Sequence, residues 1–260
     1  MPDTLRFEVT DQVATLTLDS PANRNALGAV MRVELAEVVQ AVQRDRTIRS
    51  LVITGAHGQF CSGGDLRNMA SVQLDSQGWR ERMQDLHGVV HALITLDRPV
   101  IAAVDGAAYG AGFGLALTAD FVLATPRARF CMSFMRVGLA PDFGALYTLP
   151  RIVGTQRAKE LMLSAREVGA DEAVRLGIAM ELQPPEQLLA RAQALARSFV
   201  EASPTAVSVV KRALAAGGPD LATMLALEAD GQAVAFGTDV HRSAVARFLA
   251  KEPARFQWPD

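Results

Sequence analysis

Two short glycine-bearing segments constrain the fold of this chain more than any other feature of its sequence. The first, FCSGGDL, covers residues 60–66, and the second, DGAAYGAGFG, covers residues 105–114. An apolar run typical of a buried strand precedes each segment, at residues 50–55 and 99–104, and helix-like sequence follows each one. A turn between a strand and a helix leaves backbone N–H groups unpaired and pointing outward. Two such turns that converge can hold one oxygen atom that becomes negatively charged during a reaction.

The composition excludes several classes of protein. Half of the 260 residues are apolar, which is enough for a sizeable core in one or two domains. A formal net charge of −2 gives no electrostatic reason to bind nucleic acid or an anionic membrane. The two cysteines, Cys61 and Cys131, fit a reducing compartment and offer no disulfide framework or metal cluster. With no visible secretory signal and no uninterrupted apolar run of about 18 residues, we expect a cytoplasmic protein without a membrane span.

The pattern along the chain predicts an α/β (α+β) fold with a helical end. Residues 6–19 read as a hairpin around Asp11 and Gln12, and Asn25 is a plausible N-cap for the helix that follows. Strand, turn and helix then repeat through the two glycine segments. From Thr155 onward almost the whole sequence is helical. The apolar residues of the last helices fit either packing within the chain or assembly with other chains.

The glycine segments, with their spacing and flanks, resemble the enoyl-CoA hydratase/isomerase (crotonase) superfamily. Three further segments match in order: residues 23–27 resemble its first CoA-side loop, residues 150–154 the start of the following helix, and residues 236–251 its C-terminal signature. The resemblance implies a spiral of strand–turn–helix units with an acyl-CoA site in residues 1–200. It also implies that residues 201–260 form a helical region that assembles a homotrimer or a hexamer (a dimer of trimers).

In this family two backbone N–H groups form an oxyanion hole, and Gly64 and Ala111 match their positions. The requirement is on the backbone, so glycine and alanine are both acceptable, and the function implied is stabilisation of a thioester enolate. One such donor typically lowers the barrier by about 2.7–4 kcal/mol. The structural alternative is that both segments are only tight turns.

The sequence departs from the family's hydratases at the two positions where they carry glutamates, which here are Gly114 and Phe134. Hydration needs one carboxylate to activate water and another to manage the α-proton. Neither glycine nor phenylalanine can transfer a proton. A standard hydratase mechanism is therefore not supported by these residues.

One carboxylate remains in the right region: Asp142, within GLAPDFG at residues 138–144. This segment resembles the place where single-acid members of the family, some Δ3,Δ2-enoyl-CoA isomerases and the ring-epoxide isomerase of phenylacetate degradation, carry their base. An apolar pocket of Phe113, Phe134 and Phe143 would raise the pKa of Asp142 by desolvation. The resemblance therefore implies an enoyl-CoA double-bond isomerase, while the local alternative is an aspartate that only stabilises a Pro-Asp-Phe-Gly turn.

Three other functions stay open. The chain also resembles the 4-chlorobenzoyl-CoA dehalogenase branch, in which Asp142 would act as a nucleophile and His87 as a base, although Phe134 replaces that branch's tryptophan. A dehalogenase- or hydrolase-like enzyme, a hydratase with weak hydration, and a catalytically silent acyl-CoA-binding subunit are the alternatives. His87 and His91 lie one helical turn apart, but without a third ligand they do not indicate a metal site.

The remaining binding residues follow from the resemblance. Arg24 and Lys251 are candidates for contacts with CoA phosphates, and Asp65 fits an N-cap of the next helix. Ser62, Asp65 and Leu66 would border the bound substrate, and residues 66–83, together with Phe113 and Phe134, would shape the acyl pocket. The acyl-CoA is the implied partner, and no separate cofactor is implied because coenzyme A is part of the substrate.

Overall fold

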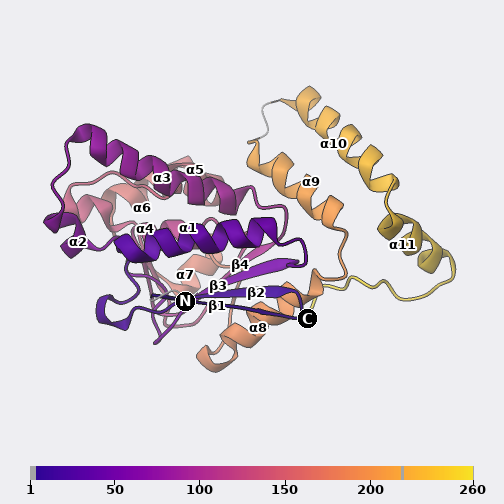
Figure 1. Ribbon diagram of the computed structural model, residues 1–260, viewed down its shortest axis with the longest axis horizontal. Coiled ribbons are helices and arrows are strands. Elements are labelled where there is room, and N and C mark those ends of the chain that lie inside the picture. Colours follow the sequence, from indigo (N-terminus) through magenta and orange to yellow (C-terminus); the bar gives the residue numbers. More distant parts are fainter. Residues whose placement is uncertain (1–3, 218–219, 260) are drawn as a thin grey trace.

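A six-stranded sheet forms the centre of the computed structural model, which describes residues 4–217 and 220–259 (Figure 1). Its strand order is β1-β2-β3-β4-β6-β9, antiparallel between β1 and β2 and parallel elsewhere. These strands are β1 (Leu5–Thr10), β2 (Val13–Leu18), β3 (Ser50–Gly55), β4 (Val100–Val104), β6 (Phe121–Ala124) and β9 (Glu181–Leu182). The predicted hairpin is confirmed: Asp11 and Gln12 both have positive φ, 50° and 64°, as its two-residue turn requires.

The central strands are buried on both faces, which explains their continuous apolar sequence. In β3, Leu51 and Ile53 point into one hydrophobic core and Val52 points into another. Helices α1 and α3 cover the first core, and α8 covers the second. The two glycine segments follow β3 and β4, so they leave the same edge of the sheet.

The helices surround the sheet and continue beyond it. They are α1 (Ala29–Arg44), α2 (Leu66–Ser71), α3 (Ser76–Ile94), α4 (Ala111–Ala116), α5 (Ala145–Val153), α6 (Thr155–Ser164), α7 (Ala170–Arg175), α8 (Pro185–Ser198), α9 (Pro204–Ala215), α10 (Leu221–Phe236) and α11 (Asp239–Leu249). Short 3-10 turns occur at Pro21–Asn23 and Ser133–Val137. None of the described helices combines the length and the apolar character that crossing a bilayer requires.

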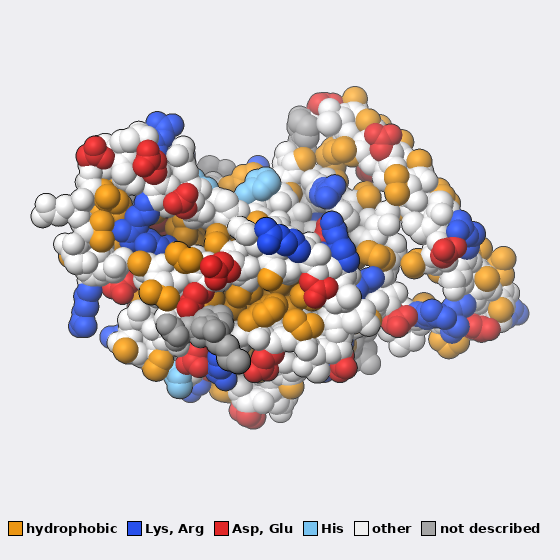
Figure 2. Space-filling view, in the orientation of Figure 1, with side chains coloured by type: hydrophobic (Ala, Val, Ile, Leu, Met, Phe, Trp, Pro, Cys, Tyr) orange, Lys and Arg blue, Asp and Glu red, His pale blue; other side chains and the backbone are white. Residues whose placement is uncertain are grey.

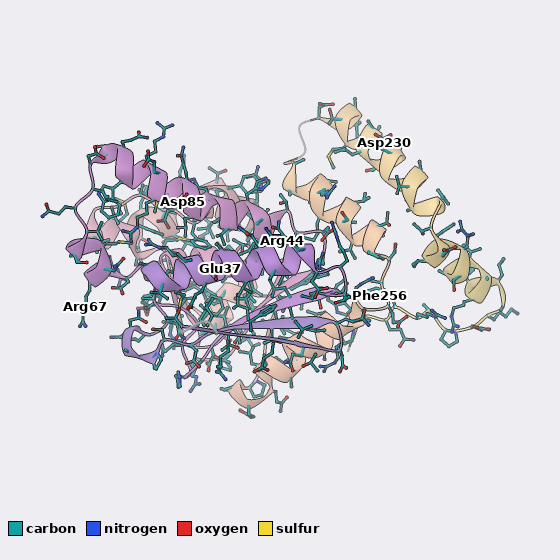
Figure 3. All side chains as sticks on the ribbon, in the orientation of Figure 1. Glu37, Arg44, Arg67, Asp85, Asp230 and Phe256 are labelled. Atoms are coloured by element: carbon teal, nitrogen blue, oxygen red, sulfur yellow. The ribbon has the colours of Figure 1, made fainter. Side chains whose placement is uncertain are left out.

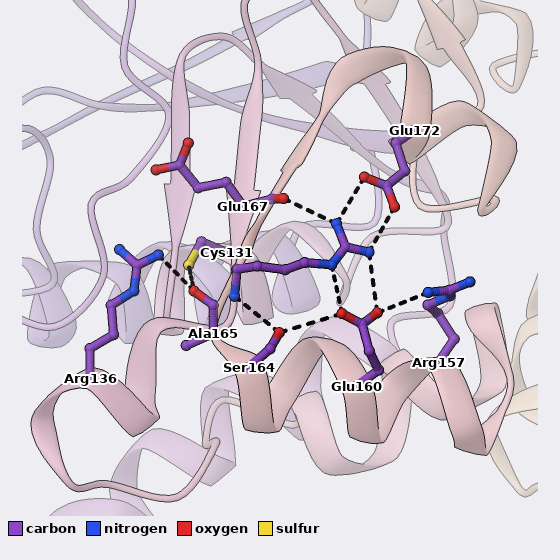
Figure 4. Close-up of polar contacts among 9 residues, drawn as sticks. Cys131, Arg136, Arg157, Glu160, Ser164, Ala165, Glu167 and Glu172 are labelled. Carbon is purple, nitrogen blue, oxygen red and sulfur yellow. Dashed lines mark hydrogen bonds and ion pairs between the residues drawn. The ribbon is translucent and has the colours of Figure 1, made fainter.

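A second, three-stranded sheet supports the second glycine segment. It consists of β5 (Ala107–Tyr109), β7 (Arg129–Cys131) and β8 (Glu167–Gly169), with β7 in the middle. Beside β8, Arg166 forms ion pairs with Glu160 and Glu172 at 2.6 and 2.7 Å, which fixes β8 between α6 and α7 (Figure 4). Across the sheet, the Tyr109 hydroxyl donates to Glu167 at 2.5 Å. The segment before Ala111 is therefore held from both sides.

Two local predictions were wrong. Asn25 does not cap α1, whose N-cap is Gly28; it is buried with φ of 58°, and its side chain accepts from Ser20 N and donates to Ala56 O and Gln59 O. Asn25 thus ties the 20–25 loop to the end of β3. The segment 150–154 closes α5 rather than starting a helix, with Pro150 inside the last turns.

Helices α9 to α11 extend from the core as an arm, and we use that name for residues 204–249 (Figure 1). No residue of α10 or α11 is buried, and Phe236, Phe248 and Leu249 are 62%, 80% and 75% exposed. After the arm the chain returns, and Phe256 lies back at the core, where its ring meets Phe199 (Figure 3). The arm therefore presents large apolar side chains that nothing in one chain covers.

We expect the arm to assemble three chains, or six, because exposed apolar surface of this kind marks a protein–protein interface. Light scattering at micromolar concentration should give the mass of a trimer or hexamer. Phe248→Glu should lower that mass, whereas Val33→Glu, at an exposed position of α1 in the core, should leave it unchanged. A monomer at every concentration would contradict the expectation.

Candidate active site

The two glycine turns interlock. Cys61 N donates to Ala107 O at 2.8 Å, and Tyr109 N donates to Cys61 O at 2.9 Å, so the turns pair like two short parallel strands. A β carbon added at Gly112 would lie 2.3 Å from Cys61 O, and one added at Gly63 would lie 2.7 Å from Tyr109 O. Both contacts are shorter than any side chain allows, so glycine is required at these two positions.

Both turns carry N–H groups that the interlock leaves without a partner among the described residues, and Gly64 and Ala111 are two of them. Neighbouring groups are used: Leu27 N donates to Gly63 O, and Gly110 N donates to Cys131 O. Across residues 4–217 and 220–259, the N–H groups of Gly64 and Ala111 donate to no acceptor. The turns are close at this point, because a β carbon on Gly63 would lie 3.7 Å from Ala111 N. Two free donors on adjacent turns are the arrangement that stabilises a developing oxyanion.

Apolar side chains border these donors. The buried ring of Phe134 lies against the second turn, 3.7 Å from where a Gly110 β carbon would be. On the first turn, the Met69 methyl group lies 2.5 Å from the corresponding point of Gly64. Met69 was not singled out from the sequence, where it is one apolar residue of a short helix. An apolar border lowers the local dielectric, which strengthens the interaction of the donors with a negative charge.

Asp142 carries a carboxylate that the fold leaves unsatisfied. Its Oδ1 is buried and accepts no hydrogen bond from any residue that the structure describes. Burial raises the pKa of Asp142 to about 6, and the charge of His87 opposes part of this rise. The next residues, Phe143 and Gly144, have positive φ of 52° and 75°, and Phe143 is fully buried. This strained turn holds Asp142 in place.

Gly114 lies directly behind the Asp142 loop. A β carbon at this position would be 2.7 Å from Phe143 Cβ and 3.0 Å from Phe143 O. Position 114, which the family resemblance matches to the first glutamate of hydratases, therefore has no room for a side chain. Main chain of the Asp142 loop fills the space instead.

Asp142 and His87 line the same cavity, of about 630 Å³, between α3, α5 and α9. Its walls are mainly apolar, and Arg212 from α9 also contributes. A larger cavity of about 1020 Å³ lies between α9 and the edge of the sheet at Phe121, but it contains none of the three candidate catalytic residues. Its size alone therefore does not make it the reaction site.

Four predicted binding residues lie at the first turn. Arg24 is exposed and its carbonyl accepts from Ser62 N at 3.1 Å, while Ser62 Oγ donates to Asn23 O. Asp65 is the N-cap of α2, as predicted, because its Oδ1 accepts from Arg67 N and Asn68 N. Leu66 is exposed at the start of the same helix.

Two other predicted residues lie elsewhere. Phe113 is fully buried, with its ring 5.2 Å from Phe130, so in this structure it supports α4 from the core and does not face the cavity. Lys251 lies two residues after the end of α11, just beyond the arm, whereas the glycine turns adjoin α2 and α4 in the core (Figure 1). To approach a CoA phosphate at this site, Lys251 requires a neighbouring chain.

The comparisons with known proteins agree on the family. The chain matches the enoyl-CoA hydratase/isomerase family over residues 8–259. It is 38% identical to a protein of Rhodobacter capsulatus named "Probable enoyl-CoA hydratase" over 97% of both chains, and 37% identical to the 1,2-epoxyphenylacetyl-CoA isomerase of Escherichia coli over 94% of both. A crystal structure of an enoyl-CoA hydratase/isomerase from Cupriavidus metallidurans superposes with a TM-score of 0.95, at 46% identity over 100% of this chain and 98% of the other.

This chain therefore belongs to the enoyl-CoA hydratase/isomerase family, and its mixed α/β architecture is the crotonase fold. The family resemblance and the fold class read from the sequence are both confirmed.

The close contact at Gly114 yields a prediction for Gly114→Ala. The added methyl group should push Phe143 and Asp142 out of position, which costs roughly 1–3 kcal/mol of unfolding free energy and lowers turnover. Urea unfolding and steady-state kinetics measure the two effects. Gly88→Ala is the matched control, because Gly88 is at an exposed position of α3 and nothing lies within 4 Å of its added methyl group. An active, fully stable Gly114→Ala protein would contradict the packing described.

The raised pKa of Asp142 yields a prediction for stability against pH. The folded-state pKa of about 6 exceeds the ordinary value of 3.8. Protonated Asp142 therefore makes its full contribution to the free energy of unfolding below about pH 4, and this contribution is lost as the pH rises through 6. Asp142→Asn removes this loss. The variant should exceed the wild type in unfolding free energy at pH 8, by at most about 3 kcal/mol, and should match it at pH 4.

Urea unfolding at both pH values measures this difference. Asp230→Asn, which changes an exposed aspartate of α10, should show no pH-dependent gain (Figure 3). Equal stability of wild type and Asp142→Asn at pH 8 would mean that the Asp142 carboxylate is solvated.

Proposed function

We propose that this protein is an enoyl-CoA isomerase, which moves a carbon–carbon double bond within an acyl-CoA by proton transfer through Asp142. One observation carries the proposal: Asp142 has a pKa of about 6 and a buried, unpartnered oxygen, and its loop packs against Gly114, three residues after the free N–H of Ala111. An isomerase needs only one base, because the proton that leaves one carbon returns to another.

The proposed reaction uses each group at a defined atom. The thioester oxygen accepts hydrogen bonds from Gly64 N and Ala111 N, which makes the α C–H of a Δ3-enoyl thioester more acidic. The Asp142 carboxylate removes that proton, and the electron pair spreads over the allylic carbons and the thioester oxygen. Asp142 then returns the proton to C4, and the double bond moves to C2–C3. A pKa of about 6 suits this role, because the carboxylate is mostly ionised at pH 7 and more basic than an exposed aspartate.

The lack of a second acid argues against hydration. The hydratase positions hold Gly114, which has no room for a side chain, and Phe134, a buried ring. The E. coli relative is named an isomerase and the R. capsulatus relative a hydratase, so the relatives' names support both activities and the local residues favour the first.

A second candidate is favoured by one observation, that His87 and Asp142 line the same cavity. In a dehalogenase- or hydrolase-like enzyme Asp142 would attack the acyl group's ring and His87 would activate water. Phe134 weakens this candidate because its side chain offers no hydrogen-bond donor.

The proposal includes the rest of the substrate and the assembly. Coenzyme A enters as part of the substrate, with Arg24 and a neighbouring chain's copy of the arm near its phosphates, so no separate cofactor takes part. We place the enzyme in the cytoplasm as a trimer or hexamer.

Asp142→Asn should abolish double-bond migration and leave CoA-ester binding largely intact. The amide has nearly the size of the carboxylate but cannot accept a proton at neutral pH, and a sole base should contribute at or above the upper end of about 10²–10⁴-fold. The conversion of 3-hexenoyl-CoA, followed by the absorbance of the conjugated product, measures the rate. Binding of butyryl-CoA by calorimetry measures the site.

His87→Ala is the contrasting variant, which should change isomerisation little but should stop a reaction that needs a water-activating base. Near-normal isomerisation by Asp142→Asn would exclude this aspartate as the base. Loss of turnover in both variants, with an acyl–Asp142 adduct detected by mass spectrometry, would support the nucleophilic candidate. Binding without turnover on any Δ3-enoyl, Δ2-enoyl, ring-epoxide or aryl-CoA would indicate a silent acyl-CoA-binding subunit.

A further inference from the structure

Two arginines without acidic partners meet between α1 and α3. Arg32 on α1 is half-buried, and the positive charge of Arg82 on α3 adds to burial in lowering the pKa of Arg32. The Arg32 guanidinium has no hydrogen-bond partner within residues 4–217 and 220–259. Arg82 donates from Nη2 to Asn68 Oδ1 at 3.1 Å and stacks near the Trp79 ring at 5.1 Å. Its Nε is buried and has no hydrogen-bond partner in the described part of the chain.

This arrangement is costly unless an anion completes it. Two like charges in a partly dry environment repel, and a buried donor without an acceptor loses its hydrogen bonds to water with nothing in exchange. Two other arginines show how the fold satisfies a guanidinium that it packs closely: Arg166 has two glutamates, and the buried Arg98 pairs with Asp97 and two backbone carbonyls. Guanidinium groups in a pair match the geometry of a carboxylate or phosphate.

The arginine pair lies near the thioester site. Asn68, the hydrogen-bond partner of Arg82, immediately precedes Met69, whose methyl group covers Gly64. Arg82 precedes His87 on α3 by five residues, about 7.5 Å along the helix axis. Figure 2 shows basic side chains recessed in a hollow among α1, α2 and α3. The pair is therefore within the length of an acyl-CoA whose thioester oxygen lies at Gly64.

We propose that Arg32 and Arg82 form a binding site for an anionic oxygen group of the acyl-CoA substrate. The group is a carboxylate at the far end of the acyl chain or a phosphate of coenzyme A, and the same paired guanidinium groups recognise either one. This inference rests on acyl-CoA binding as proposed above and does not depend on which reaction follows. The guanidinium groups of Arg32 and Arg82 supply the donors.

Three probes distinguish the two sources: butyryl-pantetheine, butyryl-CoA and glutaryl-CoA, which add first the nucleotide phosphates and then a distal carboxylate. Their dissociation constants are measured by calorimetry on the full-length wild type, Arg82→Gln, Arg82→Lys and Arg32→Gln. Arg80→Gln on exposed α3 is the matched control, since it removes one arginine of the same helix outside the pair. None of the three saturated probes can isomerise, so the result is independent of turnover.

If the anion is the acyl carboxylate, the wild type should bind glutaryl-CoA roughly 10–100-fold more tightly than butyryl-CoA, and Arg82→Gln and Arg32→Gln should remove this preference. Arg82→Lys should retain part of it. If the anion is a phosphate, the same variants should instead reduce the factor by which butyryl-CoA binds more tightly than butyryl-pantetheine. Unchanged binding of butyryl-pantetheine shows that the variants are folded.

Two ratios of dissociation constants decide the outcome: glutaryl-CoA to butyryl-CoA, and butyryl-CoA to butyryl-pantetheine. The inference is overturned if Arg32→Gln and Arg82→Gln change neither ratio by more than Arg80→Gln does. If the arginine-dependent binding preference is found in a protein without isomerase activity, the anion site stands and only the proposed reaction is rejected. If the protein is an active isomerase but shows no such preference, the reaction stands and the anion site is rejected.

Discussion

The contact between the two glycine turns is the constraint on which the rest of the site depends. Gly63 and Gly112 touch backbone of the opposite turn at distances that exclude a β carbon, so the turns can approach only with glycine at both positions. Strands β3 and β4 fix where the turns begin, and the Tyr109–Glu167 hydrogen bond and the ion pairs around Arg166 fix the second sheet behind one of them. The unpaired N–H groups of Gly64 and Ala111 are therefore in place before any substrate arrives, and preorganised donors of this kind cost no rearrangement during the reaction.

The position of the Asp142 carboxylate lowers the stability of the fold. Asp142 is held by a turn with two left-handed residues, Phe143 and Gly144, and one of its oxygens is buried without a partner. Both features reduce stability, and both supply what a base needs: a fixed position and a raised pKa. The same turn fills the space behind Gly114, so the fold that supports one acid leaves no room there for another. The choice between one and two proton-handling groups is thus decided by main-chain packing as well as by side-chain identity.

The sequence predicts most of the fold because its signals are local. Apolar runs predicted β3 and β4, the Asp11–Gln12 turn predicted the hairpin, and Asp65 predicted the start of α2. Predictions failed where contacts between residues distant in sequence determine the local structure. Asn25, for example, donates to carbonyls more than thirty residues away and does not cap α1. The three-residue strand β8 is short enough to be hidden among helical segments, and its pairing with β7 is long-range. Likewise, no local pattern links Arg32 to Arg82, since only the packing of α1 on α3 brings them together.

The central claim is that one carboxylate and two backbone donors perform a proton transfer and not a hydration. The most direct test is to follow 3-hexenoyl-CoA with the wild-type enzyme in D₂O by NMR. The account predicts 2-hexenoyl-CoA as the product, with any deuterium confined to C2 and C4, the two ends between which Asp142 carries the proton. Appearance of 3-hydroxyhexanoyl-CoA at a comparable rate would contradict it, because water would then have been activated by a group that this site is described as lacking.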